Sequence, residues 1–315
     1  MRVISQQRYG GPEVLEMIEA AVPEPLPTEI RVRVLAAGVN PVDWKTREGK
    51  GMAKALGEPP FSVGWDLAGI VDAAGPGVSR FAAGDRVMGM PWFPRQAAAY
   101  ADYVVGPARQ FVAVPDPVDI KTAAATPLAG TTAWQILHDV AKVRSGQRVL
   151  VIGAGGGVGH IAVQLAKLAG ARVSGVDSAD KLAWLSKLGL DEGHDFRHGD
   201  FSDVFADQDI VVDFIGGDQS RRSLNCLRPG GMVVAVPSSV LGDGLEEAAA
   251  EVGRKVGRII VEPDRVALEA VAAQLAAGEL TVDVGACFDL EDVRNAHRVG
   301  EAGEAVGKIV LTTDH

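Results

Sequence analysis

The first part of the chain carries apolar residues in the alternating pattern of half-buried strands. Residues 29–36 (EIRVRVLA) alternate apolar and charged side chains, which predicts an antiparallel strand with one face in a core. Further short strands are predicted over residues 69–74, 85–90 and 101–105. Turns rich in glycine and proline separate them. The pattern therefore predicts a β-rich first domain.

From residue 120 onward, short apolar runs alternate with segments of helical periodicity. The runs that we predict as strands are 149–152, 173–176, 210–214 and 232–236. Such alternation is typical of a parallel sheet with helices on both faces. A helix is predicted over 264–277 with Pro263 at its first position, and a last strand over 308–312.

A chain of 315 residues with 47% hydrophobic content is long enough for two cores. We expect a first domain over residues 1–120 and a second over 121–260. Residues 261–315 are expected to return to the first domain.

The segment 148–181 combines a strand, a glycine-rich turn, a helix and a second strand that ends at an acid. Gly153, Gly156 and Gly159 recur every three residues, and Asp177 ends the second strand. In such a unit the glycines let the backbone approach a pyrophosphate, whose charge lies at the helix N-terminus. The alternative is that these glycines serve only tight packing. The dinucleotide-binding residues that we expect here are Gly153, Gly156, Gly157, Val158, Gly159, Asp177, Ser178 and Lys181.

Asp177 bears on the choice of cofactor. A carboxylate at this point accepts hydrogen bonds from the ribose hydroxyls of NADH and repels the 2′-phosphate of NADPH. Lys181 is the first cation after it and keeps NADPH open, since a flexible lysine can reach a phosphate. Alternatively, Asp177 only caps the helix that starts near Asp180. We expect NADH to be favoured over NADPH.

Charge and composition exclude several classes of protein. The net charge of −10 and a pI near 5.1 do not suit a nucleic-acid-binding surface. Two distant cysteines, Cys226 and Cys287, build neither a disulfide framework nor a cysteine zinc site. No apolar stretch reaches 18 residues and no signal peptide is seen, so we expect a cytoplasmic protein with no membrane partner. His194 and His198 can hold a metal on a helix, but flanking glycines favour a solvated loop.

Several stretches resemble the medium-chain dehydrogenase/reductase superfamily, and within it the zinc-free quinone oxidoreductase (zeta-crystallin-like) branch. They are residues 36–49 (AAGVNPVDWKTREG), 63–87 (VGWDLAGIVDAAGPGVSRFAAGDRV), 125–134 (ATPLAGTTAW), 148–181 and 306–311 (VGKIVL). The resemblance covers essentially the whole chain in order. It implies an α/β protein with a GroES-like β-rich catalytic domain and a Rossmann domain built on a doubly wound parallel sheet. It also implies hydride transfer from NAD(P)H.

The zinc-dependent alcohol dehydrogenases are similar to this chain but differ at the metal site. They place a cysteine after the A-G-V sequence and a His-Glu pair after the later glycine, where this chain has Asn40 and Trp65-Asp66. A catalytic zinc needs three protein ligands, which these positions do not supply. We therefore expect no zinc. Alcohol oxidation then lacks its Lewis acid, whereas reduction of a quinone or an activated C=C bond needs none.

The resemblance also suggests catalytic and substrate-binding residues. It places Asn40 near the nicotinamide carboxamide and the substrate carbonyl; alternatively, Asn40 is a turn residue before Pro41. Lys45 stands where some family members carry a substrate-binding tyrosine, and is either a catalytic cation or a solvated charge. Trp92 and Phe93, in a proline-rich loop, are expected to line an apolar substrate pocket.

Further cofactor contacts are expected beyond the carboxyl ends of later strands, where ligands of parallel sheets bind. These are Ile215 and Gly216 after the strand 210–214, and Pro237 and Ser238 after the strand 232–236. Lys308 is expected to contact the cofactor from the C-terminal segment.

The predicted activity is reduction of a small-molecule quinone or enone. Two alternatives stay open: a zinc-free alcohol or ketone oxidoreductase of a biosynthetic pathway, and a nucleotide-binding protein with little turnover. We also expect a homodimer, in which residues 258–261 (RIIV) form an edge strand that pairs two parallel sheets.

Overall fold

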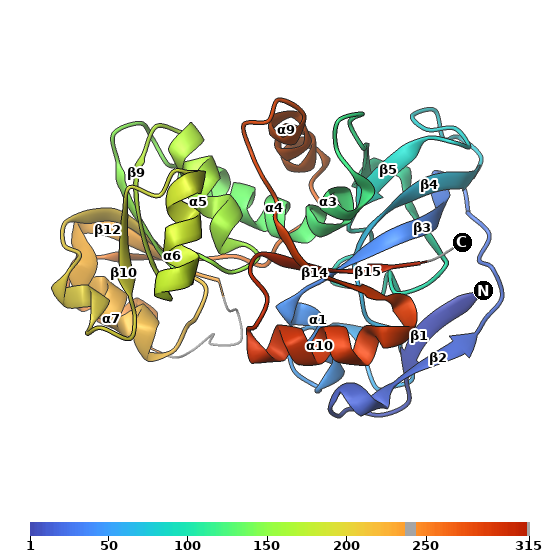
Figure 1. The fold of residues 1–315 in the computed structure, drawn as a ribbon, viewed down its shortest axis with the longest axis horizontal. Coiled ribbons are helices and arrows are strands. Elements are labelled where there is room, and N and C mark those ends of the chain that lie inside the picture. Colours follow the sequence, from blue (N-terminus) through green and yellow to red (C-terminus); the bar gives the residue numbers. More distant parts are fainter. Residues whose placement is uncertain (237–243, 314–315) are drawn as a thin grey trace. The chain divides into compact units, whose positions relative to one another are not determined.

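The structure is a computed structural model that describes residues 1–236 and 244–313. The chain forms two compact units, and Figure 1 labels many of their elements. The β-rich unit comprises residues 1–131, 262–278 and everything from 282 onward, and the parallel-sheet unit comprises residues 132–261 and 279–281. The first boundary thus falls at residues 131/132 rather than at 120/121. Helix α3 (Ile120–Ala125) belongs to the β-rich unit because its buried face of small residues packs on strands β3 and β4.

A seven-stranded sheet forms the core of the β-rich unit. Its strands are β3 (Glu29–Val39), β4 (Asp66–Ala74), β5 (Arg86–Gly89), β6 (Tyr103–Pro107), β7 (Phe111–Ala113), β14 (Val284–Asp289) and β15 (Lys308–Thr312). The order is β14-β15-β3-β4-β5-β7, with β6 also paired to β3, and only the β14–β15 pair is parallel. A separate hairpin joins β1 (Arg2–Gln6) and β2 (Leu15–Glu19).

Strand β3 is the central strand of this sheet and ends at the residue before Asn40. Ile30, Val32 and Val34 are fully buried, as their alternation with charged residues predicts. The strand continues to Val39, beyond the predicted end at residue 36, because β15 pairs with residues 36–39. This pairing brings Lys308, the first residue of β15, beside the end of β3.

Short helices connect and cover the sheet of the β-rich unit. They are η1 (Pro12–Val14), α1 (Pro41–Arg47), α2 (Ala53–Leu56), η2 (Ala108–Gln110), α3, α9 (Arg265–Ala276), η7 (Leu290–Asp292) and α10 (Val293–Ala302), and α4 (Pro127–Trp134) spans the unit boundary. The prediction that Pro263 begins the helix α9 is wrong. Asp264 is its N-cap, since its carboxylate accepts a hydrogen bond from the Val266 amide at 2.8 Å.

The parallel-sheet unit contains six strands in the order β10-β9-β8-β11-β12-β13, all paired in parallel. They are β8 (Arg148–Ile152), β9 (Arg172–Asp177), β10 (Glu192–Asp195), β11 (Gln208–Asp213), β12 (Leu227–Ala235) and β13 (Lys255–Arg258). The helices are η3 (Gln135–Val140), α5 (Gly159–Leu168), α6 (Ala179–Leu185), η4 (Ser186–Leu188), η5 (Phe201–Asp203), α7 (Asp218–Cys226) and α8 (Leu245–Glu251). The strand order reverses between β8 and β11, the place where doubly wound sheets bind ligands.

Two expectations for this sheet need correction. The segment around His194 is the edge strand β10 rather than a loop, because His194 pairs in register with Val176 of β9. The other edge strand, β13, ends at Arg258 and does not extend over residues 258–261. Its pairing with β12 ends where Ala235 lies opposite Arg258. None of the helices that the structure describes is long and apolar enough to cross a lipid bilayer.

Candidate active site and cofactor-binding turn

The glycine-rich turn joins β8 to α5 at the carboxyl end of the parallel sheet. Gly153 has a φ of +78°, a conformation that side chains with a Cβ rarely adopt. The amides of Gly153 and Ala154 donate to the Val176 carbonyl at 3.0 and 3.2 Å. The turn is therefore fixed to the end of the neighbouring strand β9.

Gly159 begins helix α5 and packs directly against the turn. A Cβ at this position would lie 2.6 Å from the Ala154 carbonyl oxygen, and closer still to that of Gly153. At Gly156, by contrast, a Cβ would meet only one atom within 4 Å, the Gly153 oxygen at 3.3 Å. The turn thus presents bare backbone ahead of the N-terminus of a ten-residue helix, which fits the pyrophosphate of a dinucleotide.

Asp177 holds this turn in place. Its carboxylate accepts hydrogen bonds from the amides of Gly155 and Ser178, each at 2.8 Å. The interpretation of Asp177 as nothing more than a helix cap is wrong, because Ser178 is the N-cap of α6 and one carboxylate oxygen binds the turn. Sequence reasoning missed Gly155, whose amide provides that second contact.

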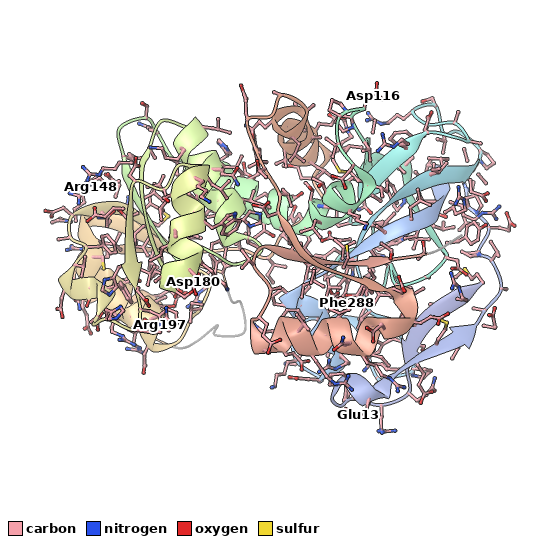
Figure 2. All side chains as sticks on the ribbon, viewed as in Figure 1. Glu13, Asp116, Arg148, Asp180, Arg197 and Phe288 are labelled. Atoms are coloured by element: carbon pink, nitrogen blue, oxygen red, sulfur yellow. The ribbon has the colours of Figure 1, made fainter. Side chains whose placement is uncertain are left out.

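Two cations lie near the tip of β9. The Lys181 side chain lies against Gly155, where a Cβ would be 2.7 Å from its Cβ and Cδ atoms. Asp195 of β10 pairs in register with Asp177, and Arg197 forms an ion pair with Asp195 at 2.8 Å. Figure 2 labels Arg197 and Asp180, which interact electrostatically. Arg197 was not predicted, because its approach depends on the pairing of β10 with β9.

The loop after β11 lies beside the same turn. The buried Asp213 carboxylate accepts the amides of Ile215 at 2.8 Å and Gly216 at 3.1 Å. Ile215 is 59% exposed, and its Cδ1 atom is 3.1 Å from the position of a Cβ at Gly153. The structure thus brings the predicted residues Ile215 and Gly216 to the glycine turn. Pro237 and Ser238 lie outside the described residues.

In the β-rich unit, Asn40 is bound at both ends of its side-chain amide. Its Nδ2 donates to Oδ2 of Asp66 at 2.8 Å, and its Oδ1 accepts a hydrogen bond from Nζ of Lys308. The Asn40 backbone amide donates to Asp43 at 2.7 Å. Asn40 and Lys308 are only 1% and 3% exposed. The lysine that contacts Asn40 is therefore Lys308 of β15, not the half-buried Lys45 of helix α1.

Asp66 connects three segments of the chain. Besides Asn40, it accepts the Leu128 amide at 2.7 Å at the start of α4, and it lies 3.7 Å from the Lys308 ammonium. Burial raises the pKa of Asp66, and the nearby Lys308 opposes that shift. Burial lowers the pKa of Lys308, and Asp66 opposes that shift in turn. Each group thus opposes the effect of burial on the pKa of the other.

Asp43 and Tyr100 extend this network. The Tyr100 hydroxyl donates to Oδ2 of Asp43 at 2.9 Å, and burial raises the pKa of Asp43 to about 7. Burial and the neighbouring Asp43 both raise the pKa of Tyr100. The cluster of Asn40, Asp43, Asp66, Tyr100 and Lys308, here called the buried polar cluster, can therefore gain or lose a proton near neutral pH.

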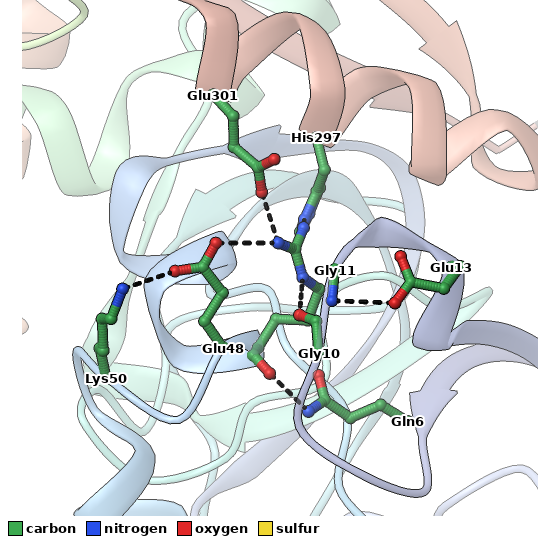
Figure 3. A network of polar contacts seen from close by, with 9 residues as sticks. Gln6, Gly10, Gly11, Glu13, Glu48, Lys50, His297 and Glu301 are labelled. Atoms are coloured by element: carbon green, nitrogen blue, oxygen red, sulfur yellow. Dashed lines mark hydrogen bonds and ion pairs between the residues drawn. The ribbon is translucent and has the colours of Figure 1, made fainter.

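Arg47 fixes the far end of helix α1, and Figure 3 labels its partners Gly10, His297 and Glu301. Its side chain is 0% exposed and donates to the Gly10 carbonyl at 3.0 Å, to His297 Nδ1 at 3.0 Å and to Glu301. Burial and the Arg47 charge lower the pKa of His297 to about 3, so its neutral ring accepts this bond. Helix α1 is thus held between Asp43 at its N-terminus and helix α10 at its C-terminus.

Of the two residues predicted to line the substrate pocket, Phe93 is buried and Trp92 is half-buried. Phe93 is 7% exposed and packs edge-on against the buried Trp65 at 5.3 Å between ring centroids, so it belongs to the core. The Trp92 indole is half-buried and donates to the Val105 carbonyl at 2.8 Å. A role of either ring in substrate binding stays a prediction.

No group of three or more His, Cys, Asp or Glu side chains that can hold a metal ion occurs in residues 1–236 and 244–313. His194 instead contacts the Gly199 carbonyl at 3.1 Å. The resemblance implies that zinc-dependent dehydrogenases carry metal-site residues at the positions of Asn40 and Trp65-Asp66. Here Asn40 binds Asp66 and Lys308, and Lys308 lies 3.7 Å from Asp66.

Comparison with known proteins gives a consistent result over the whole chain. Residues 26–116 match the family of alcohol dehydrogenase GroES-like domains, and residues 188–311 match the family described as zinc-binding dehydrogenases. The 2-haloacrylate reductase of a Burkholderia species is 33% identical over 96% of both chains. The 2-methylene-furan-3-one reductase of Solanum lycopersicum is 31% identical over 99% of this chain and 79% of its own.

Solved structures agree with this result. The quinone oxidoreductase of Coxiella burnetii has a TM-score of 0.95 and 32% identity, covering 100% of this chain and 99% of its own. The Escherichia coli quinone oxidoreductase, solved with NADPH, has a TM-score of 0.89 and 28% identity over 99% of this chain and all of its own. The predicted fold, a GroES-like domain with a parallel-sheet Rossmann domain, is confirmed. The chain belongs to the medium-chain dehydrogenase/reductase superfamily, among its quinone oxidoreductases and related reductases.

Proposed function

We propose that this chain is an NAD(P)H-dependent oxidoreductase that reduces a quinone or an activated C=C bond without zinc. The observation that carries the proposal is the contact of Asn40, Asp66 and Lys308, at positions where the resemblance implies the metal site of zinc-dependent dehydrogenases. A buried ammonium already lies next to the carboxylate there, so a second cation at this point would be repelled.

The named substrates of the relatives share one chemical feature. A haloacrylate, a methylene-furanone and a quinone each carry a C=C bond conjugated to a carbonyl or carboxylate group. When hydride adds to the far carbon, negative charge develops on the oxygen. Such a reaction needs alignment of the acceptor, hydrogen-bond donors for that oxygen and a proton, and no Lewis acid.

The residues of this chain suit these tasks. The glycine turn and the N-terminus of α5 would hold the pyrophosphate of the cofactor, which when bound supplies the hydride. The loop at Ile215 and Gly216 extends the same surface. Asn40 offers amide N–H groups, and the buried polar cluster holds a proton near neutral pH. Lys45, Trp92 and Phe93 remain candidates for contact with the substrate.

Turnover assays with the purified chain test the proposed reaction. We expect oxidation of NADPH or NADH by 1,4-benzoquinone and by a simple enone, with rates that a metal chelator leaves unchanged. Primary alcohols with the oxidised cofactors are expected to react at background rate. Alcohol oxidation that a chelator abolishes would contradict the proposal. Cofactor binding with no turnover of any acceptor would favour the nucleotide-binding alternative.

The cofactor proposal differs from the expectation of NADH. The solved structures do not favour NADH: the quinone oxidoreductase of E. coli and a mycobacterial protein were solved with NADPH, whereas a structure at 32% identity is named an NAD-dependent alcohol dehydrogenase. Asp177 already binds the amides of the turn, and Lys181 lies against the turn. We therefore propose that Asp177 braces the turn for either cofactor and that Lys181 contributes binding energy for the 2′-phosphate of NADPH.

Paired titrations of NADH and NADPH distinguish these roles. Asp177→Ala is expected to weaken both cofactors about tenfold, because the Gly155 amide loses its acceptor. Lys181→Ala is expected to weaken NADPH alone by about tenfold. The control is Lys187→Ala, at an exposed lysine in η4, the helix that directly follows α6. If Asp177→Ala weakens NADH and strengthens NADPH, the carboxylate acts on the ribose instead of the turn.

The predicted homodimer stays a proposal. It is supported by the position of β13 at the edge of the parallel sheet, where its outer backbone groups can pair with a second copy. The residues concerned are 255–258 rather than 258–261.

A further inference from the structure

The Asn40 side chain is held in a single orientation by two oppositely charged groups. An amide can be turned by half a rotation with little change in shape, which exchanges its oxygen and its nitrogen. Here the ammonium of Lys308 requires the oxygen at one end, and the carboxylate of Asp66 requires the nitrogen at the other. The reversed orientation would place an N–H against a cation and an oxygen against an anion.

This arrangement leaves one N–H of Asn40 for another partner. The side-chain nitrogen carries two protons, and among the described residues Asp66 is the group that accepts one of them. The Lys308 ammonium withdraws electron density through the amide oxygen, which makes the remaining N–H a stronger donor. Inside a protein the effect is larger than in water because the local dielectric constant is low.

We propose that Lys308 is a positioning residue for the reduction reaction, holding the Asn40 oxygen so that Asn40 presents an N–H, and not a C=O, to a carbonyl group in the active site. The inference rests on the proposed function. In this proposal Lys308 affects the reaction through its contact with Asn40. The sequence alone predicts a direct contact between Lys308 and the cofactor instead.

The cost of the arrangement supports a role beyond packing. Lys308 is 3% exposed, and burying an ammonium is unfavourable unless it is paired and hydrogen-bonded. An apolar side chain of similar length would fill the same space, and replacing a buried ion pair by apolar groups is often neutral or stabilising. The ammonium contacts Asn40, Asp66 and, at 3.4 Å, the Val39 carbonyl. Its position is therefore well defined at the junction of β3 and α1.

A double-mutant cycle on turnover tests the inference. Lys308→Met is expected to lower kcat at saturating cofactor and acceptor by about tenfold or more, as loss of a charge-assisted hydrogen bond does. The Kd of NADPH is expected to change less than about twofold, because the contact is with Asn40 and not with the cofactor. In an Asn40→Ala background, Lys308→Met is expected to lower kcat no further. Lys54→Met, at an exposed lysine, is the matched control.

Several results would overturn the inference. A rise in the Kd of NADPH with unchanged kcat would show a direct cofactor contact, and additive effects in the cycle would show that Lys308 does not act through Asn40. Lower thermal stability with wild-type kcat would show a structural role only. If Lys308→Met does not fold, the single variant Asp66→Asn is compared with the double variant Asp66→Asn/Lys308→Met. The double variant removes both charges together and so leaves no unpaired buried charge. If the wild-type chain turns over no acceptor, the proposed function itself has failed, and that is seen before any variant is made.

Discussion

Replacement of Gly159 by alanine is expected to weaken cofactor binding by about 100-fold or more. The new methyl group would lie 2.6 Å from the Ala154 carbonyl oxygen and closer to that of Gly153. Both obstacles are backbone atoms of the turn itself, so neither can move aside as a flexible side chain would. Helix α5 would have to shift away from the turn, and the backbone amides would no longer converge on a phosphate.

The binding of NADPH, followed by quenching of tryptophan fluorescence or by calorimetry, measures this effect. Gly253→Ala is a suitable control in the same unit. Gly253 has a φ of +66° and nothing within 4 Å of a Cβ, so the substitution strains the backbone without a collision. The control is expected to lose some stability and keep its affinity. Wild-type affinity in Gly159→Ala would mean that the turn does not hold the cofactor.

Arg47→Met is expected to lower the free energy of unfolding by about 3 kcal/mol. The guanidinium is completely buried, and it is the donor for the Gly10 carbonyl, for His297 and for Glu301. Methionine fills much of the space but donates nothing, so these three acceptors and Glu48, which accepts from the guanidinium at 3.3 Å, lose that donor at once. Gly10 lies in the loop after β1, and His297 and Glu301 lie on helix α10, so the loss loosens the contacts that hold helix α1.

Urea denaturation followed by circular dichroism measures the change. Lys50→Met removes an exposed cation that pairs with Glu48, and is expected to change the unfolding free energy by less than about 0.5 kcal/mol. A loss in Arg47→Met that is no larger than in this control would show that the buried network contributes nothing to stability. Because two units unfold, the transition of each should be resolved before a single value is assigned.

The elements of the fold could be predicted because their signals are local. Strands β8, β9 and β11 are short buried runs, and each was located from a few consecutive residues. The end of β3 was placed too early, and β10 was missed, since both are extended only by pairing with a distant strand. A pattern along the chain carries no information about such pairing partners.

The candidate site shows the same division. The glycine turn and Asp177 follow one another in the sequence, and the structure brings them together as hydrogen-bond partners. Lys45 was named as a candidate cation because it stands where some family members carry a substrate-binding tyrosine, with a solvated charge as the alternative. The cation that the structure places against Asn40 is Lys308, brought there by the register of β15. Phe93 was expected in a loop rather than in the core because prolines surround it. It does lie in a turn, but its side chain is buried against Trp65, which no local pattern indicates.

The contact between Asn40 and Lys308 also has a consequence for biosynthesis. The two residues are 268 positions apart, and the whole parallel-sheet unit lies between them in the chain. During translation, β3 therefore leaves the ribosome long before β15, the strand that must lie between it and β14. The second unit can complete its sheet first, while the unit that began earlier waits for its last strand. A chain released before residue 308 would thus carry a finished nucleotide-binding fold but no β15, so the edge of β3 beside Asn40 would be unpaired. We expect chaperones to bind such a chain and expect it to be inactive.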